Sequence, residues 1–288
     1  MIAGKARIMI PKRTLNDGNP LPAVGFGTWR LAEGQRTIDI LKTALSLGYR
    51  HIDTAARYEN EVSVGTALSE SGVARSSLFV VSKVWNDMRG YESTLRACRE
   101  SLAKLKLAYL DLYLIHWPAT EKFFSNADAL NLETWRALET LQADGLVRSI
   151  GVSNFLPHHL QPLLDKGAVV PAVDQIKLHP GLPQAETMRF CLAHGILPEA
   201  WSPLGAGKLL ASGPLRSIAE RCGQSPAQVC VRWCIQRGAV PVVKSSTPER
   251  MRENRDVFGF VLTESDMEAL DRLPAVGSAA PDPDSILY

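Results

Sequence analysis

The chain has 288 residues, of which 45% are hydrophobic and 22% are charged, and both values are ordinary for a globular protein. Its 32 Lys and Arg residues against 30 Asp and Glu residues give a formal net charge of +2. This balance excludes a general binder of nucleic acid, so any anion site must be local. The length suits either two ordinary domains or one α/β barrel.

Cysteine usage and hydropathy indicate where the chain works. No C-x-x-C pair occurs among the five scattered cysteines, which favours buried thiols in a reducing cytoplasm over disulfides or a zinc cluster. The stretch before Pro11 lacks the apolar run of a secretory signal, and no run approaches the ~18 apolar residues of a membrane span. We therefore expect a cytoplasmic protein without contact to a membrane. No H-E-x-x-H motif occurs, and His158, His159 and His179 show no metal-ligand spacing, so no metal is expected.

Short extended runs alternate with helical patterns along most of the chain. Residues 7–21 read as a hairpin with a turn at Asp17-Gly18, which can cap one end of a sheet. Eight strand-then-helix units follow. The expected strands are residues 23–27, 49–54, 78–84, 110–116, 147–153, 172–178, 196–201 and 240–244. The helices that follow them are expected at 34–47, 61–71, 91–107, 132–144, 157–166, 185–194, 215–222 with 226–236, and 248–257.

This alternation predicts parallel strands joined by right-handed crossovers. Eight units in about 250 residues predict an α/β fold of the closed (β/α)8 TIM barrel type, as a single domain over residues 1–288. The N-terminal hairpin is expected to cap the barrel, with an extra helix over residues 263–273 and a surface loop over 275–288. The alternative is an open doubly wound sheet, but Gly25-Phe26-Gly27 lacks the third glycine and the helix start of a dinucleotide-binding turn.

Four polar side chains fall at or just after the ends of predicted strands: Asp53, Tyr58, Lys83 and His116. The carboxyl ends of parallel barrel strands meet at one face, so these groups are expected to meet. A lysine ammonium beside a tyrosine lowers the phenol pKa from about 10, and an aspartate holds the lysine in place. Tyr58 is then a proton donor to an oxygen that gains negative charge, and His116 either binds and orients that oxygen or assists the proton transfer. With no serine or cysteine nucleophile in evidence, the pattern suits carbonyl reduction by an external hydride source.

The segment from Lys244 to Arg250 indicates an anion site. It runs from the eighth predicted strand into a helix that begins at Thr247-Pro248, where backbone N–H groups and the helix dipole favour phosphate. Lys244 and Arg250 supply more positive charge than a diphosphate alone needs. This suggests a phosphorylated ribose, and therefore NADPH over NADH.

Several motifs occur together and in order. Asp53-x-Ala55-x-x-Tyr58-x-Asn60-Glu61 matches the signature D-x-A-x-x-Y-x-N-E of the aldo-keto reductases, and three further segments are similar to other motifs of that family. These segments are Gly25-Phe26-Gly27-Thr28-Trp29, Ser82-Lys83-Val84-Trp85 and Ile115-His116-Trp117-Pro118. The chain thus resembles this family nearly from end to end, and its short tail is most similar to compact microbial members such as diketogluconate reductases and prostaglandin F synthase-like proteins. The resemblance implies a catalytic tetrad of Asp53, Tyr58, Lys83 and His116, with Tyr58 as the acid.

The resemblance also implies a site for NADPH or NADP+ and a substrate pocket. The implied cofactor-binding residues are Thr28, Trp29, Asp53, Ser153, Asn154, Gln175, Trp201, Ser202, Leu204, Lys244, Ser245, Ser246, Arg250, Glu253 and Asn254. Among these, Ser153, Asn154 and Gln175 correspond to residues that hold the nicotinamide carboxamide, and Trp201 to the ring that stacks on nicotinamide. The implied substrate-binding residues are Trp29, Tyr58, Trp85, His116 and Trp117.

Three residues near this site lie outside the resemblance. Asp174 stands where the family often has asparagine, Lys177 stands where it has a neutral or acidic residue, and Glu199 near Trp201 receives no role. The expected function is NADPH-dependent reduction of aldehydes or ketones, such as dicarbonyls or keto sugars, by a monomer. One alternative is a nucleotide-binding regulatory barrel with little turnover. Another is a barrel hydrolase, which needs a nucleophile, a carboxylate pair or a metal site that the sequence does not assemble.

Overall fold

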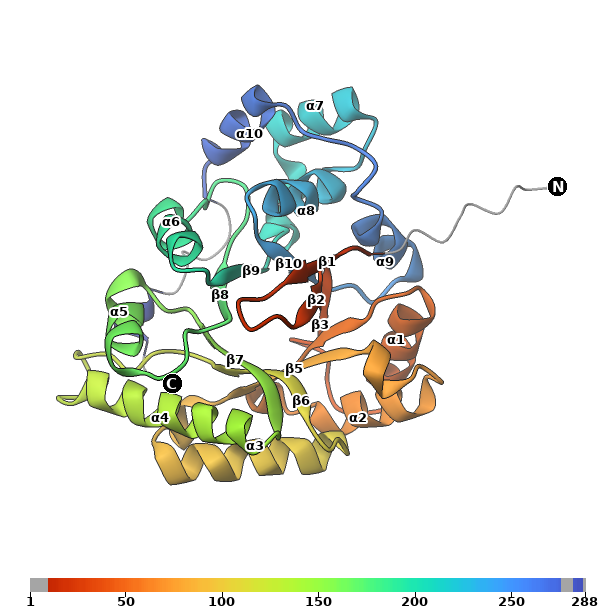
Figure 1. The fold of residues 1–288 in the computed structure, drawn as a ribbon. Coiled ribbons are helices and arrows are strands. Elements are labelled where there is room, and N and C mark those ends of the chain that lie inside the picture. Colours follow the sequence, from red (N-terminus) through yellow and green to blue (C-terminus); the bar gives the residue numbers. More distant parts are fainter. Residues whose placement is uncertain (1–9, 276–281, 287–288) are drawn as a thin grey trace.

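A computed structural model describes residues 10–275 and 282–286. Its central feature is a closed barrel of parallel strands in the order β10-β3-β4-β5-β6-β7-β8-β9, with helices around it (Figure 1). The barrel strands are β3 (Gly25–Gly27), β4 (His51–Asp53), β5 (Phe79–Val84), β6 (Leu110–Ile115), β7 (Val147–Ser153), β8 (Val173–Lys177), β9 (Leu197–Trp201) and β10 (Val240–Val243). The closed ring confirms the predicted (β/α)8 barrel and excludes the open doubly wound sheet.

The helices follow the strands in the predicted order. They are α1 (Gln35–Ser46), α2 (Glu61–Glu70), α3 (Tyr91–Leu105), α4 (Ala127–Ala143), α5 (Pro157–Lys166), α6 (Ala185–Ala193), α7 (Gly213–Cys222), α8 (Pro226–Gln236), α9 (Pro248–Arg255) and the extra C-terminal helix α10 (Glu264–Asp271). Short 3-10 segments are η1 (Ala56–Tyr58), η2 (Arg75–Ser77), η3 (Asn86–Met88), η4 (Gly205–Ala211) and η5 (Pro283–Ser285). The described part of the tail, residues 282–286, therefore contains a helical turn, η5, where only loop was expected; the rest of the predicted loop after residue 275 lies outside the described residues.

Helix α4 begins at Ala127, five residues before the predicted start at residue 132. The reason is the buried side chain of Asn131, which accepts a hydrogen bond from the backbone N–H of Ala119 and donates one to its carbonyl. A polar residue that ties the first turns to the preceding loop interrupts the apolar spacing from which the start was predicted.

The N-terminal hairpin closes one end of the barrel (Figure 1). Its strands β1 (Lys12–Thr14) and β2 (Pro20–Pro22) are antiparallel; the predicted extended run at residues 7–9 lies outside the described residues. Leu15 and Leu21 pack into the apolar cluster of the barrel interior, and Asn16 donates a hydrogen bond to the carbonyl of Pro171, just before β8. The hairpin thus covers the amino ends of the strands and leaves the carboxyl ends for the site.

Alternate residues of each strand point into the barrel, which divides its interior into two parts. Phe79 and Val81 of β5 lie in the apolar cluster near the hairpin, and Lys83 follows two residues later on the same face. Similarly, Leu197 of β9 lies in that cluster and Glu199 follows it. The interior is therefore apolar toward the amino ends and polar toward the carboxyl ends, where catalytic residues of such barrels lie.

The cysteines follow the prediction except at one position. All five are unpaired and lie on helices, and Cys98, Cys191, Cys230 and Cys234 are buried. Cys222 is partly exposed because it ends α7. In the described parts of the chain, no helix has the length and apolar character needed to cross a membrane.

Candidate active site

Three of the predicted catalytic side chains meet at the carboxyl ends of β4 and β5. Nζ of the fully buried Lys83 lies 2.8 and 2.7 Å from the two carboxylate oxygens of Asp53. It also donates to the carbonyl of Thr54 at 3.0 Å and to the hydroxyl of Tyr58 at 3.3 Å. The parallel pairing of β4 with β5 creates this contact, because Asp53 stands opposite Val81, two residues before Lys83. The result is a buried ion pair with a phenol within its reach.

The surroundings keep both the lysine and the tyrosine protonated. Burial opposes the charge of Lys83, but Asp53 and Tyr58 together raise its pKa above the usual value. Burial also raises the pKa of Tyr58, and Lys83 only partly offsets this effect. The expectation that Lys83 would give Tyr58 a lowered pKa is therefore wrong, because desolvation of the phenolate outweighs the nearby cation. Tyr58 is therefore protonated at neutral pH.

His116 follows β6 and packs against two other rings of the site. Its imidazole makes edge-to-face contacts with Tyr58, at 5.7 Å between ring centroids, and with Trp85, at 4.9 Å. Burial, with the positive charges of Lys83 and Arg57, holds the pKa of His116 well below its usual value. A neutral imidazole is suited to orient a carbonyl oxygen by a hydrogen bond rather than to supply a proton.

The residues expected to hold nicotinamide form one hydrogen-bonded group on β7, β8 and β9. Asn154 accepts a hydrogen bond from the indole Nε1 of Trp201 at 2.8 Å, and its Nδ2 donates to Ser153 and to the carbonyl of His116. Ser153 donates to the carbonyl of Gln175 at 2.7 Å. Trp201 remains partly exposed, so its ring can stack on a planar group.

Gln175 also connects this group to Asp53, one of the predicted catalytic residues. Its Nε2 donates to Asp53 at 2.8 Å and to Glu199 at 2.5 Å, and Glu199 in turn lies 3.2 Å from Nε2 of His51. The sequence assigned no role to Glu199 or His51. One signal in the sequence could have identified them. Residues two apart on a strand face the same side; His51 precedes Asp53 by two residues, and Glu199 precedes Trp201 by two.

The predicted phosphate segment lies at the start of α9. Lys244, Ser246 and Arg250 are exposed, whereas Ser245 and Asn254 are buried and Glu253 is partly exposed. Thr247 takes the N-cap position as expected, but its side chain does not cap the helix. Ser245 instead accepts a hydrogen bond from the backbone N–H of Thr247 at 3.1 Å. Two exposed cations beside a helix start without a side-chain cap fit the phosphates of a dinucleotide.

The aromatic residues expected around the substrate differ in exposure. Trp29 is 48% exposed with Arg30 stacked on its ring at 4.3 Å, Trp85 is partly exposed, and Trp117 is buried. Ser202 and Leu204, in the loop after β9, are both partly exposed.

Thr28 is fully buried, and its hydroxyl donates to Asn60. Asn60 also donates to the carbonyls of Thr28 and Leu31 and accepts a bond from Thr54. The asparagine of the sequence motif therefore ties the loop after β3 to the end of β4, which gives it a structural role.

Asp174 and Lys177 face different environments. Asp174 points away from the barrel interior and is fully buried near Cys191, with Sγ and carboxylate oxygen 3.7 Å apart. Burial raises the pKa of Asp174 well above its usual value, although a hydrogen bond from the backbone N–H of Phe155 opposes this effect. Nζ of Lys177 lies 5.6 Å from the ring centroid of Trp201, and burial lowers the pKa of this lysine.

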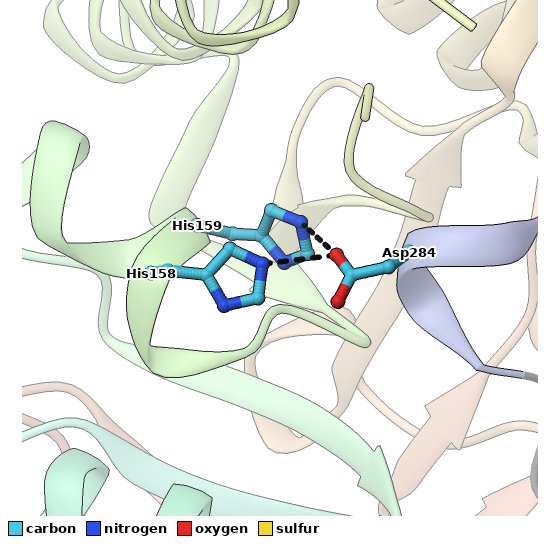
Figure 2. Close-up of side chains that lie close together, drawn as sticks. All are labelled: His158, His159 and Asp284. Atoms are coloured by element: carbon cyan, nitrogen blue, oxygen red, sulfur yellow. Dashed lines mark hydrogen bonds and ion pairs between the residues drawn. The ribbon is translucent and has the colours of Figure 1, made fainter. Parts of the chain in front are cut away.

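A histidine pair meets the tail at the start of α5. Figure 2 shows His158 and His159 directed at Asp284 of η5, with Nε2 atoms 2.9 and 3.0 Å from one carboxylate oxygen. Their ligand atoms lie within 4.8 Å, a grouping that sequence spacing did not reveal because Asp284 is far along the chain. Nδ1 of His159 accepts a hydrogen bond from the backbone N–H of Leu156, so Nε2 of the neutral ring carries the proton. A metal ion would need a free lone pair on Nε2, but that atom carries a proton. The arrangement therefore suits a hydrogen-bonded anchor for residues 282–286.

The fold is a (β/α)8 barrel that carries a protonated phenol beside a buried ion pair at the carboxyl ends of its strands, an arrangement that can deliver a proton to a substrate oxygen. The sequence model of the aldo/keto reductase family matches residues 23–275, and the chain belongs to this family. It is 46% identical over 274 residues to the glyoxal reductase of Bacillus subtilis strain 168, across 95% of this chain and 96% of that protein.

Two solved structures show the same fold. An aldo/keto reductase from Brucella melitensis matches with a TM-score of 0.85 and 45% identity, over 91% of this chain and 99% of that one. An aldo-keto reductase from Bombyx mori, solved in complex with NADP, matches with a TM-score of 0.85 and 36% identity, over 92% of each chain.

Proposed function

We propose that this protein reduces aldehydes and ketones to alcohols with NADPH, and that small dicarbonyls such as glyoxal are the first substrates to test. The observation that carries the proposal is the contact of Lys83 with both Asp53 and Tyr58 beside a neutral His116. The relative named glyoxal reductase supports the choice of dicarbonyls. Keto sugars and other small carbonyl compounds belong to the same substrate class.

The catalytic roles follow from protonation states. The neutral His116 orients the carbonyl oxygen by a hydrogen bond. NADPH, when bound, would supply the hydride for the carbonyl carbon. Tyr58 donates its phenolic proton to the oxygen as negative charge develops there, and the ammonium of Lys83 stabilises the phenolate that remains. Asp53 keeps Lys83 charged and in place.

The same proposal assigns the cofactor site. Ser153, Asn154 and Gln175 would bind the nicotinamide carboxamide, and the exposed face of Trp201 would stack on the ring. The loop and helix residues Thr28, Trp29, Ser202, Leu204, Lys244, Ser245, Ser246, Arg250, Glu253 and Asn254 would contact the rest of the dinucleotide. Trp29, Trp85 and Trp117 would line the substrate pocket with Tyr58 and His116.

The test is loss of NADPH absorbance with a panel of aldehydes, dicarbonyls and keto sugars, repeated with NADH. Tyr58→Phe should lower kcat by about 10²-fold or more, because it removes only the proton donor. Tyr91→Phe is the matched control, since the Tyr91 hydroxyl contacts Thr140 on the helical surface. A Tyr58→Phe variant as fast as the parent enzyme refutes the assigned acid.

We also propose that the whole chain acts as one barrel domain, as a monomer, in the cytoplasm, and on small molecules rather than nucleic acid. The near-neutral net charge supports the last point. Size-exclusion chromatography with light scattering at micromolar concentration tests the monomer. The regulatory alternative predicts tight NADPH binding with no turnover across the panel and a stable protein partner, and the reductase relatives disfavour it.

A further inference from the structure

The barrel interior holds a second carboxyl group that the mechanism above does not use. Glu199 on β9 is fully buried, and its Oε2 accepts a hydrogen bond from Nε2 of Gln175. The same nitrogen donates to Oδ2 of Asp53 at 2.8 Å. An amide nitrogen has two protons, and Gln175 donates both of them to these two carboxyl groups. Its carbonyl oxygen is then the amide atom directed away from both.

The other oxygen of Glu199 faces a histidine. Oε1 lies 3.2 Å from Nε2 of His51, and both side chains have no exposed surface. The ring of His51 lies close against β3, where a Cβ at Gly25 would come within 2.7 Å of its Nδ1. Glycine at position 25 thus leaves the space in which His51 reaches Glu199.

We propose that Glu199 works as a protonated positioning residue: its acid proton on Oε1 is donated to His51, and its Oε2 holds Gln175 in the orientation that serves both Asp53 and the nicotinamide carboxamide. This inference rests on the proposed function, because it takes the carbonyl oxygen of Gln175 to be an acceptor for the carboxamide. Loss of the Glu199 acceptor lets the amide of Gln175 rotate, and Asp53 then loses its hydrogen bond from Gln175 while it keeps the ion pair with Lys83.

The charges around the pair agree with a protonated Glu199. Burial raises the pKa of Glu199 to about 8 and the charge of Asp53 adds to this, while Gln175 and Lys83 oppose it. Burial lowers the pKa of His51 to about 4, against the pull of Asp53. Between about pH 4 and about pH 8, Glu199 is therefore the neutral acid and His51 the neutral imidazole, so the two side chains together carry no net charge. The groups that face it are Asp53 on β4, Lys83 on β5, Gln175 on β8 and Tyr58 of η1.

Ionisation of Glu199 has a direct consequence for the reaction. Above about pH 8 a second negative charge appears beside Asp53, and this charge raises the pKa of Tyr58 further. Tyr58 then becomes a weaker acid, although its own proton is lost only at higher pH. Carbonyl reduction by the wild-type enzyme should therefore decline with an apparent pKa near 8.

Two substitutions separate the protonated form from the carboxylate. Glu199→Gln presents a carbonyl oxygen to Gln175 and an amide proton to His51, so it reproduces the neutral acid at every pH. Its KM for NADPH at pH 7 should stay within about threefold of wild type, and the decline near pH 8 should disappear. Glu199→Leu keeps the bulk but offers no acceptor, so the Kd for NADPH should rise about tenfold and kcat should fall.

The measurements are the Kd of NADPH by fluorescence titration, and kcat and KM from pH 6 to 9.5. Glu61→Gln is the control, since Glu61 is a buried glutamate on α2 that accepts a bond from Ser82 outside the barrel interior. It should affect stability without removing the decline near pH 8. If Glu199→Leu does not fold, the pH profile of Glu199→Gln decides alone.

The inference is overturned if Glu199→Gln is as impaired as Glu199→Leu, or if its activity still declines near pH 8. An unchanged Kd for NADPH in a folded Glu199→Leu enzyme also overturns it. Failure of the proposed function looks different, because the wild-type enzyme itself then neither binds NADPH nor reduces any carbonyl.

Discussion

Oδ1 of Asn154 accepts a 2.8 Å hydrogen bond from the indole of Trp201, which links the end of β7 to the end of β9 across β8. Asn154 has a left-handed backbone with φ of 63°, a conformation that asparagine tolerates better than most residues. One side chain therefore fixes the plane of the proposed stacking ring and, through its Nδ2, the backbone at His116.

We predict that Asn154→Ala raises the KM for NADPH about tenfold or more, because the indole loses its acceptor and the backbone becomes strained. The lost bonds and the strain should together lower the free energy of unfolding by about 2–3 kcal/mol. Steady-state kinetics and chemical denaturation measure the two effects. Asn154→Asp keeps an acceptor for Trp201 but loses the donor to His116, and should therefore lie between the parent and Asn154→Ala.

We predict a loss of stability as the pH falls from about 6.5 to about 4. Burial lowers the pKa of both His51 and His159 to about 4, whereas in the unfolded chain each histidine takes up its proton near pH 6.5. The unfolded state thus binds more protons in this window, and the fully buried His51 accounts for up to about 3 kcal/mol. Urea denaturation across this range measures the effect.

A variant isolates the histidine from Glu199, whose raised pKa acts in the opposite direction between pH 8 and about 4.5. His51→Gln should be less stable than wild type at pH 7 but should lose less stability on acidification. The exposed His194 provides the control, and His194→Gln should keep the wild-type slope. An unchanged slope in His51→Gln contradicts the assignment.

We predict that Asp174→Asn stabilises the protein at alkaline pH. Burial raises the pKa of Asp174 well above the unfolded value, so the folded chain holds a proton that the unfolded chain releases as the pH rises. The neutral amide removes this penalty. The Tm advantage over wild type should be present at pH 5 and should grow towards pH 9, by about 2–4 °C for each kcal/mol recovered. Asp144→Asn, at an exposed position, should change neither value. A lower Tm at pH 9 would show that the carboxylate form is needed.

The strand and helix order was predictable because it depends on local patterns. Polar residues such as Lys83 end apolar runs, and apolar spacing marks the helices, so eight units and their catalytic strand ends follow from the sequence. The start of α4 at Ala127 was missed because Asn131 makes a tertiary bond that no local pattern records.

The interior network was not predictable for a related reason. Glu199 on β9 and His51 on β4 come from strands that are separated in the ring by β10 and β3, and they meet only in the barrel interior. The raised pKa of Tyr58 also depends on burial, which the sequence does not quantify. Lys83 lowers this pKa as the charge argument predicts, but burial raises it by more. The assigned roles of the cofactor residues remain predictions until the variants are measured.

The pairing of β3 with β10 has a consequence for biogenesis. During synthesis, the strand that carries Phe26 emerges early but waits for Val243, which is translated more than two hundred residues later. Until then, both strand edges of the unfinished sheet are unpaired and open to association with other chains. Quality control during translation should therefore matter most for nascent chains that stop short of β10, since these have most of the core but no closed ring.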